Sequence, residues 1–217
     1  LRRHGVKIVS RWMRGVDNVR FNPLHRNNFL RNRFGAPEKI IVGFVGRLAR
    51  EKQVERLAKV AEMKNVSIVI VGDGPCREKL ERLMPAAHFV GFSTGNELSE
   101  LYASFDVFVH TGIDETFCQS VQEALASGVP VIAPAVGGPL DLVQHGHNGF
   151  LWSPHRNDTL FESVNEIVTN HAVRETCAGN ARATVAHRTW DSVMAELVEH
   201  YRSVMTGDLS VKVEVAS

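Results

Sequence analysis

Short apolar runs alternate with amphipathic segments along most of this chain, with glycine or proline at most of the junctions. The runs are rich in β-branched residues and apolar at nearly every position, whereas a strand with one solvated face would alternate. Strands of this kind are buried on both faces, which is typical of a parallel sheet. We therefore predict six parallel strands, at Ile40–Gly46, Val66–Val71, His88–Gly91, Val107–His110, Val129–Ala133 and Gly149–Trp152.

The segments between these runs carry apolar residues at helical spacing. Helices of this kind would cover both faces of the sheet, so the pattern predicts an α/β fold, a Rossmann-like parallel sheet with helices on both faces. After the last strand the helical pattern continues from Asp158 to about Met205. The spacing occurs at Val54–Ala61, Leu98–Tyr102 and Val121–Leu125, and more loosely at Leu140–Val143.

Length and composition narrow the organisation of the chain. Its 217 residues are 44% hydrophobic and 23% charged, which predicts a packed core and excludes a disordered class. No apolar stretch is long enough to cross a membrane, and the N-terminus lacks a signal-peptide pattern. Because the sequence starts at Leu1 and runs directly into strand-like residues, we expect a piece of a longer chain. We divide it into an interdomain linker with the start of a lobe (1–37), the main domain (38–205) and a tail (206–217).

The net charge of +1 conceals an asymmetry along the chain. Residues 1–37 contain nine lysines and arginines against one acid, Asp17. Such a leader could bind nucleic acid or anionic lipid, or it could lie across the acidic remainder of the chain. We favour the second interpretation and expect no nucleic-acid partner. Three cysteines without Cys-x-x-Cys spacing predict neither a disulfide framework nor a zinc ribbon, and they fit a reducing, cytoplasmic setting.

In an open parallel sheet, ligands bind beyond the carboxyl ends of the strands, so the loops there hold the candidate chemistry. The loop Gly46–Lys52 brings two or three cations to the start of a helix, where cations oppose the helix dipole. A bound phosphate would remove that conflict, although a solvated basic turn would fit as well. The loops Gly72–Pro75 and Val136–Pro139 combine glycine with proline and permit close backbone approach.

Acidic residues follow the fourth predicted strand. Asp114 and Glu115 precede a helix N-terminus, a position that also suits ordinary helix-start acids. Glu123 lies among apolar residues within that helix, and a buried carboxylate without partners is destabilising. The paired hydroxyls of a sugar or a ribose would provide such partners.

Taken together, these motifs resemble the C-terminal donor-binding domain of retaining GT-B glycosyltransferases, in the large group of family-four hexosyltransferases. The resemblance runs from about Val6 to Tyr201. It implies that residues 38–205 form a nucleotide-sugar-binding lobe, and that an N-terminal acceptor-binding lobe lies upstream in the same parent chain. The motifs are Gly46-Arg47-Leu48-x-x-Glu51-Lys52, Gly72-Asp73-Gly74-Pro75, Glu115-x7-Glu123, Gly128-x-Pro130, Gly137-Gly138 and Gly149-Phe150-Leu151.

The resemblance implies a role for each matching residue. Arg47 and Lys52 match the cations that bind the diphosphate of the donor and support catalysis. Glu115 matches the acid beside the donor sugar, and Glu123 the acid that holds the ribose hydroxyls. Donor-contacting backbone is matched by Gly46, Thr116, Phe117, Cys118 and Gln119.

We expect no metal and no cofactor besides the donor substrate. The sequence contains no Asp-x-Asp, so side-chain cations would neutralise the leaving group. His145 and His147 have the spacing of a metal pair, but two ligands are too few for zinc. His110 either faces the donor or is an ordinary hydrogen-bonded histidine. Cys118 departs from the family, in which glycine is frequent there, so its side chain either points away from the sugar pocket or narrows it.

The implied activity is transfer of a hexose to an acceptor hydroxyl. Mannose from GDP-mannose is our first choice of donor, a UDP-hexose is the second, and the acceptor is a lipid or a glycan. We expect a cytoplasmic protein, with contact to the inner face of the membrane left open, and an isolated domain that is inactive without its N-terminal lobe. A nucleotide-sugar epimerase of the same fold and a non-catalytic nucleotide-binding module are the alternatives.

Overall fold

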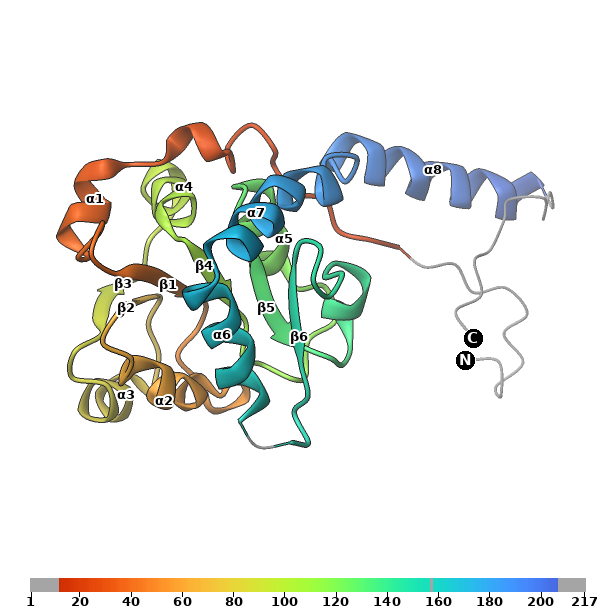
Figure 1. Cartoon of the computed structure of the whole chain (residues 1–217). Helices are drawn as coiled ribbons and strands as arrows, with labels where there is room; N and C mark the ends of the chain where they lie inside the picture. Colours follow the sequence, from red (N-terminus) through yellow and green to blue (C-terminus); the bar gives the residue numbers. More distant parts are fainter. Residues whose placement is uncertain (1–11, 157, 207–217) are drawn as a thin grey trace.

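The computed structural model describes residues 12–156 and 158–206. Six parallel strands form one sheet in the order β3-β2-β1-β4-β5-β6, so the chain builds one half outward from β1 and then returns beside β1 to build the other half (Figure 1). All six predicted strands are confirmed, with small differences at their ends. They are β1 (Ile40–Val45), β2 (Val66–Val71), β3 (His88–Gly91), β4 (Val107–Val109), β5 (Val131–Pro134) and β6 (Gly149–Trp152).

Helices cover both faces of this sheet, as the apolar pattern predicts (Figure 1). The α-helices are α1 (Asn28–Arg33), α2 (Ala58–Ala61), α3 (Arg77–Leu83), α4 (Gly95–Ser104), α5 (Gln119–Ala126), α6 (Thr159–Thr169), α7 (His171–Val185) and α8 (Trp190–Thr206). Short 3-10 helices are η2 (Pro23–His25), η3 (Arg50–Lys52), η4 (Val54–Leu57) and η5 (Gly138–Asp141).

The strands divide their side chains between two apolar cores. Ile41 and Phe108 belong to a cluster with side chains of α4, α5 and α7. Val42 and Val109 belong to a second cluster with side chains of η4, α3 and α6. Because neighbouring residues of one strand point to opposite faces, this division explains why the strands are apolar at nearly every position.

The C-terminal helical region is divided, whereas its sequence pattern is continuous. Asn170 is extended, and its side chain accepts a hydrogen bond from the Val173 N–H (3.2 Å), which ends α6 and caps α7. The looser spacing at Leu140–Val143 yields only the 3-10 turn η5, with Pro139 in its first turn. Thr206 is the last residue of α8, and the remainder of the predicted tail, 207–217, lies outside the described residues.

The described part of the basic leader packs on the domain, and Asp106 is a main anchor. The Asp106 side chain is only 10% exposed and accepts hydrogen bonds from Arg26 (2.8 Å) and Arg31 (2.9 Å). A third hydrogen bond comes from the backbone N–H of Ile41 (2.9 Å), at the start of β1. For these arginines the packing interpretation is confirmed, while residues 1–11 lie outside the described part of the chain.

Two glycines allow the loops after β1 and β2 to touch. Gly72 has φ +128°, and a Cβ atom there would lie 2.0 Å from the carbonyl oxygen of Gly46. A Cβ atom on Gly74 would lie 2.5 Å from the carbonyl oxygen of Leu48. Leu48 is fully buried, and its N–H donates to the Asp73 carbonyl (2.9 Å). The loop after β1 is therefore held in a fixed position at the edge of the sheet.

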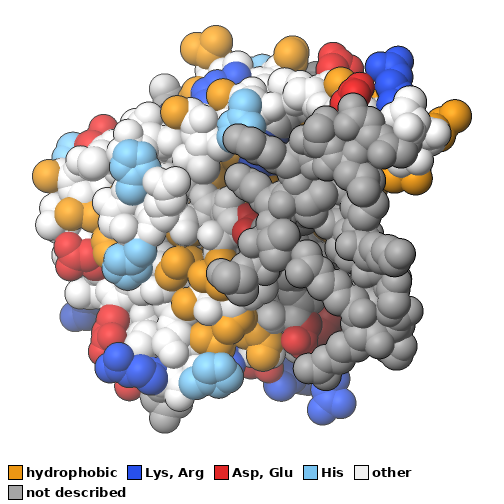
Figure 2. Space-filling view, turned by 90° about the vertical axis from the view of Figure 1, so that its right-hand side faces the viewer, with side chains coloured by type: hydrophobic (Ala, Val, Ile, Leu, Met, Phe, Trp, Pro, Cys, Tyr) orange, Lys and Arg blue, Asp and Glu red, His pale blue; other side chains and the backbone are white. Residues whose placement is uncertain are grey.

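Helix α8 extends away from the sheet (Figure 1). It carries a stripe of exposed apolar side chains. The surface seen from that side has apolar and histidine side chains toward the middle, with charges of both signs nearer its edge (Figure 2). Within the described residues, no helix is both long and apolar enough to span a membrane. The exposed large apolar residues of α8 are Trp190, Met194, Val198, Tyr201, Val204 and Met205, with exposed fractions between 41% and 86%.

The anchoring role of Asp106 can be tested by substitution. We expect Asp106→Asn to lower the free energy of unfolding by about 2–4 kcal/mol, because it leaves the largely buried Arg31 without its countercharge. Urea denaturation measures this change. Asp158→Asn is the control: it removes an exposed ion pair with Lys59 and should change stability by less than about 1 kcal/mol. Equal losses in both variants would contradict the anchoring role.

Candidate functional site

The loops after β1, β4 and β5 meet at the carboxyl edge of the sheet. The strands β1 and β4 are neighbours from which the chain runs toward opposite edges, and such a switch point leaves a crevice between their loops. The Thr111 hydroxyl donates to the Lys52 carbonyl, which joins the first two loops. The Gly138 N–H donates to the Glu115 carbonyl (2.9 Å), which joins the second and third. The structure thus brings three of the four predicted loops together, and the fourth, after β2, contacts the first through Gly72 and Gly74.

A salt bridge between Lys52 and Glu115 lies at this crevice. Lys52 Nζ donates to Glu115 Oε1, and the two side chains are 25% and 21% exposed. Partial burial strengthens such a pair relative to one in open water. Two residues predicted for different parts of one ligand are therefore in direct contact, 63 positions apart in the sequence.

Arg47 differs from Lys52 although both were predicted for the same role. Its side chain is exposed, and within residues 12–156 and 158–206 it has neither an ion pair nor a side-chain hydrogen bond. The buried Leu48 follows it and anchors the loop from below. The loop after β1 therefore carries one exposed guanidinium, Arg47, and one lysine, Lys52, that is already paired with Glu115.

Helix α5 begins without a side-chain cap. Its N-cap residue, Cys118, has the left-handed conformation (φ 48°, ψ 50°), so the first N–H groups of the helix have no capping acceptor from that side chain. Thr116 and Phe117, just before it, are exposed. Free N–H groups at a helix start attract anions. The predicted donor-contacting backbone, from Thr116 to Gln119, thus coincides with an open helix start.

The Cys118 thiol points inward. It is 2% exposed, and its Sγ atom lies 3.0 Å from the position that a Cβ atom on Gly138 would occupy. Burial raises the pKa of the thiol to about 12, and the nearby Lys52 charge offsets part of that shift. The side chain points into the protein, where its sulfur lies within 4.8 Å of ligand atoms of His110 and Glu115.

Glu123 lies one turn inside α5, in surroundings different from those of Glu115. Burial raises the pKa of its carboxyl group, and the nearby polar side chains of Tyr102 and Gln119, together with the charge of Arg20, offset part of the shift. The Tyr102 hydroxyl makes no hydrogen bond of ordinary geometry within the described residues. Burial likewise raises the pKa of the Tyr102 hydroxyl. The partners predicted for this acid therefore include groups of the chain itself, from α4 and from the basic leader.

His110 directly follows β4 and is 3% exposed. Its backbone N–H continues the sheet by donating to the Ile132 carbonyl (2.8 Å). Neither ring nitrogen has a hydrogen-bond partner of ordinary geometry among the described residues. Burial, and secondarily the charge of Lys52, lowers the pKa of the ring to about 4, so the imidazole is neutral near pH 7. A contact with the Gly112 backbone offsets part of that shift, and both alternatives for this histidine stay predictions.

Some site features were missed from the sequence. The Gln122 side chain, 1% exposed, donates to the Phe117 carbonyl (3.2 Å) and holds the turn before α5. Arg14 of the basic leader lies over the Phe117 ring at 5.1 Å. Gln122 could have been identified from the sequence, because an amide side chain within an apolar helix is expected to be buried and to need a hydrogen-bond partner. Nothing local to Arg14 indicates its contact, which depends on the path of the leader.

The histidines of the turn before β6 serve structural purposes. His145 Nδ1 accepts a hydrogen bond from the Leu151 N–H (3.2 Å). His147 pairs with Asn180 in α7 (3.3 Å). The two rings thus contact different partners rather than a shared position.

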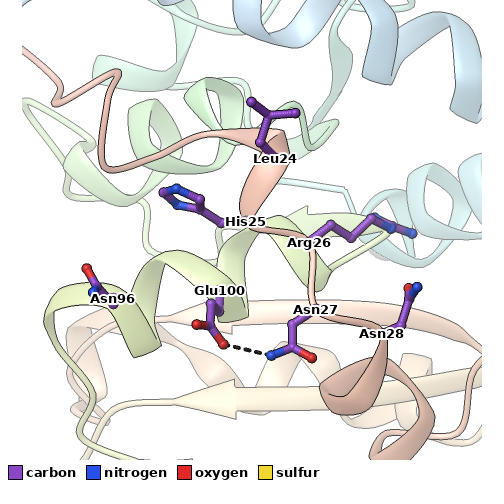
Figure 3. A pocket seen from close by; sticks show the side chains of 7 residues that line it. All are labelled: Leu24, His25, Arg26, Asn27, Asn28, Asn96 and Glu100. Carbon is purple, nitrogen blue, oxygen red and sulfur yellow. Dashed lines mark hydrogen bonds between the residues drawn. The ribbon is translucent and has the colours of Figure 1, made fainter.

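Two cavities lie outside the crevice itself. One, of about 460 Å³, is formed between the η2–α1 segment and α4, where Asn27 donates to Glu100 (2.8 Å; Figure 3). The other, of about 260 Å³, includes Thr116 and Phe117 and adjoins Gly138. Only the second contains residues predicted for the donor site. We place the functional site at the carboxyl edge of the sheet because Lys52 and Glu115 meet there.

Comparisons with known proteins identify the family to which the chain belongs. The model of the family described as glycosyl transferases group 1 matches residues 27–184. The chain is 50% identical, over 92% of its length and 52% of that protein, to the GDP-mannose-dependent alpha-mannosyltransferase of Mycobacterium tuberculosis. It is 37% identical to the sulfoquinovosyl transferase of Arabidopsis thaliana, over 86% of this chain and 38% of that one.

Among solved structures, the HepE protein of Anabaena in complex with UDP and glucose is similar, with a TM-score of 0.76 and 27% identity. The match covers 87% of this chain and 55% of that one. The chain spans about half the length of the first curated relatives that it matches. The motifs, the doubly wound sheet and these similarities agree, and the chain belongs to the group 1 glycosyltransferases, which have the GT-B fold.

Proposed function

We propose that the chain is the donor-binding half of a retaining glycosyltransferase that moves mannose from GDP-mannose to an acceptor hydroxyl. The observation that carries this proposal is the Lys52–Glu115 pair, in which a cation suited to a diphosphate lies beside an acid suited to sugar hydroxyls. Relatives from Mycobacterium tuberculosis and Corynebacterium glutamicum, at 50% and 45% identity, are named GDP-mannose-dependent. Membership of a transferase family favours transfer over the epimerase alternative.

Donor binding would exchange partners within the site. The diphosphate takes Lys52 from Glu115, and Arg47 and the open start of α5 add further positive potential. Glu115, released from Lys52, then accepts hydrogen bonds from the sugar hydroxyls and orients the ring. As the bond from sugar to phosphate breaks, the charge that develops on the leaving diphosphate is stabilised by the same cations. Catalysis thus consists of positioning and electrostatic stabilisation.

Glu123 would hold the ribose. Its carboxyl group is half-buried and has a raised pKa, so burial of the charged form is unfavourable in the free domain. Two ribose hydroxyls would add donors to a carboxylate that the chain satisfies only in part. A carboxylate that lowers the stability of the ligand-free domain is typical of a ligand-binding position.

The other half of the enzyme would supply the acceptor site and cover α8. Relatives are about twice as long as this chain, and the apolar stripe of α8 lacks a cover in the described residues. A second lobe packed against that stripe would close the donor crevice and exclude water. We expect the acceptor to be a lipid or a glycan, used on the cytoplasmic side of the membrane.

A UDP-hexose is the second candidate donor. It is favoured by the likeness to the HepE structures of Anabaena, which hold UDP with glucose or UDP-glucose. The diphosphate and ribose contacts proposed above are the same for either base. Titration with GDP and UDP therefore distinguishes the two donors without altering the assigned roles.

The diphosphate role of the loop after β1 predicts a selective loss. We expect Arg47→Ala to weaken GDP binding by about ten- to a hundredfold and guanosine binding by much less, because a charge-assisted contact contributes about 1.5–3 kcal/mol. Calorimetry with both ligands measures the difference. Arg50→Ala, an exposed arginine of the same loop, is the matched control and should change GDP binding little. Equal losses for guanosine and GDP would refute the phosphate assignment.

Glu115 should act on the sugar alone. We expect Glu115→Ala to leave GDP affinity undiminished, because Lys52 loses its competing partner, and to lower transfer by at least about tenfold in the full-length parent. Asp114→Ala removes an adjacent exposed carboxylate and gives the same change in net charge, but it should affect neither quantity strongly. Loss of GDP binding in Glu115→Ala would show that the roles of the two acids are misassigned.

Glu123 should show opposite effects on stability and on binding. Its raised pKa means that the folded state favours the protonated form, so the free energy of unfolding falls as pH rises from the ordinary pKa of a glutamate to the raised one, and the loss is complete at higher pH. We therefore expect Glu123→Gln to make the ligand-free domain more stable at pH 7.5, and the gain to shrink in acid, while GDP and guanosine both bind more weakly. Urea titrations at two pH values and calorimetry test this, with exposed Glu55→Gln as the control. Unchanged binding would remove Glu123 from the ribose site.

A further inference from the structure

Three side chains at the carboxyl edge of the sheet bring together different metal-binding groups. The ligand atoms of His110, Glu115 and Cys118 all lie within 4.8 Å of one another. An imidazole nitrogen, a carboxylate oxygen and a thiolate sulfur are the ligands that Zn²⁺ takes in proteins, and three protein ligands leave a fourth position for water. None of the three is adjacent to another in sequence, and β4 and the start of α5 hold them in place.

The state of His110 points independently to a ligand at this position. Its ring is 3% exposed, and neither nitrogen has a hydrogen-bond partner of ordinary geometry among the described residues. A buried polar group without a partner is destabilising, and a chain normally supplies one. A metal ion would use one nitrogen of the neutral imidazole.

Cys118 adds a second unusual feature. Its backbone is in the left-handed region (φ 48°), where glycine would be less strained, yet a buried thiol stands there. The Sγ atom faces the same small space as the His110 ring and the Glu115 carboxylate. Neither of the other two cysteines, Cys76 and Cys177, belongs to this cluster.

We propose that His110, Glu115 and Cys118 form a binding site for a zinc-class divalent ion. On binding, the Cys118 thiol loses its proton to solvent, a metal–sulfur bond forms, and Glu115 turns from Lys52 to the ion. Lys52 is then left without its carboxylate, and the ion occupies the space beside Glu115 that the donor sugar requires under the proposed function. The metal is thus an antagonist of donor binding rather than a participant in transfer. The binding itself does not depend on the proposed function.

Cobalt is the probe, since Co²⁺ occupies zinc sites and reports its ligands by absorption. The protein carries Cys76→Ser, which removes the partly exposed thiol. Titration of this protein with Co²⁺ should give a sulfur-to-cobalt charge-transfer band together with the visible bands of a four-coordinate ion. Addition of Zn²⁺ should displace the Co²⁺ and remove these bands. Cys118→Gly, which suits the left-handed backbone, and Cys118→Ser should both abolish the charge-transfer band and weaken Zn²⁺ binding more than about tenfold. Cys177→Ala, a buried cysteine of α7, should leave both intact.

The cysteine variants distinguish a metal ion held by Cys118 from one held elsewhere on the chain. Circular dichroism establishes that each variant is folded, and the serine variant stands in if the glycine variant is not. The proposal would be overturned if the sulfur-to-cobalt band persisted in both Cys118 variants. It would also be overturned if the band were absent from the Cys76→Ser protein in which Cys118 is intact. A band that survives Cys118 substitution but disappears in Cys177→Ala would assign the metal to a different thiol. None of these readouts requires sugar transfer, so failure of the transferase proposal would not be mistaken for failure of this one.

Discussion

Burial of a parallel sheet on both faces is the constraint on which the rest of this structure depends. Helices occupy the faces, so solvent reaches the interior of the sheet only at the ends of its strands. Polar chemistry must then be concentrated in the loops there, and the reversal of strand order between β1 and β4 opens the crevice in which Lys52 and Glu115 meet. In the loop after β1, the buried Leu48 holds the backbone against the domain, while Arg47 and Arg50 on either side of it are exposed.

Most of the sheet could be predicted because its strands are local apolar runs, most of them rich in β-branched residues, with glycine or proline near one end. The meeting of the loops could also be predicted, since parallel strands carry their carboxyl ends to one edge. The partners of individual side chains could not. Tyr102 reaches Glu123 from another helix, and Asp106 binds two arginines of the leader, so both contacts depend on packing between segments distant in sequence. The break at Asn170 was missed because its apolar spacing continues across the cap.

The two acids of the family motif illustrate different ways to hold a charge for a ligand. Glu115 is neutralised by Lys52. Under the proposed function, this pair stabilises the ligand-free site, and the diphosphate of the donor can still displace Glu115 from the lysine. Glu123 forms no such ion pair among the described residues: burial raises the pKa of its carboxyl group, and the neighbouring Tyr102 and Gln119 side chains and the charge of Arg20 offset only part of that shift. The sequence shows both residues only as acids of one motif. The structure distinguishes them by their surroundings, a salt bridge for Glu115 and burial for Glu123.

The Lys52–Glu115 pair also bears on which solutes the enzyme ignores. A crevice with two unpaired cations would attract any abundant anion, including inorganic phosphate and nucleoside triphosphates. With Lys52 already neutralised, a simple anion must break an ion pair and leaves a partly buried carboxylate without a partner. A sugar diphosphate replaces both halves, since its phosphates take the lysine and its hydroxyls take the carboxylate. Under the proposed function, the pairing of Lys52 with Glu115 makes that part of the site selective for a ligand that carries both chemistries, while the exposed Arg47 remains open to other anions.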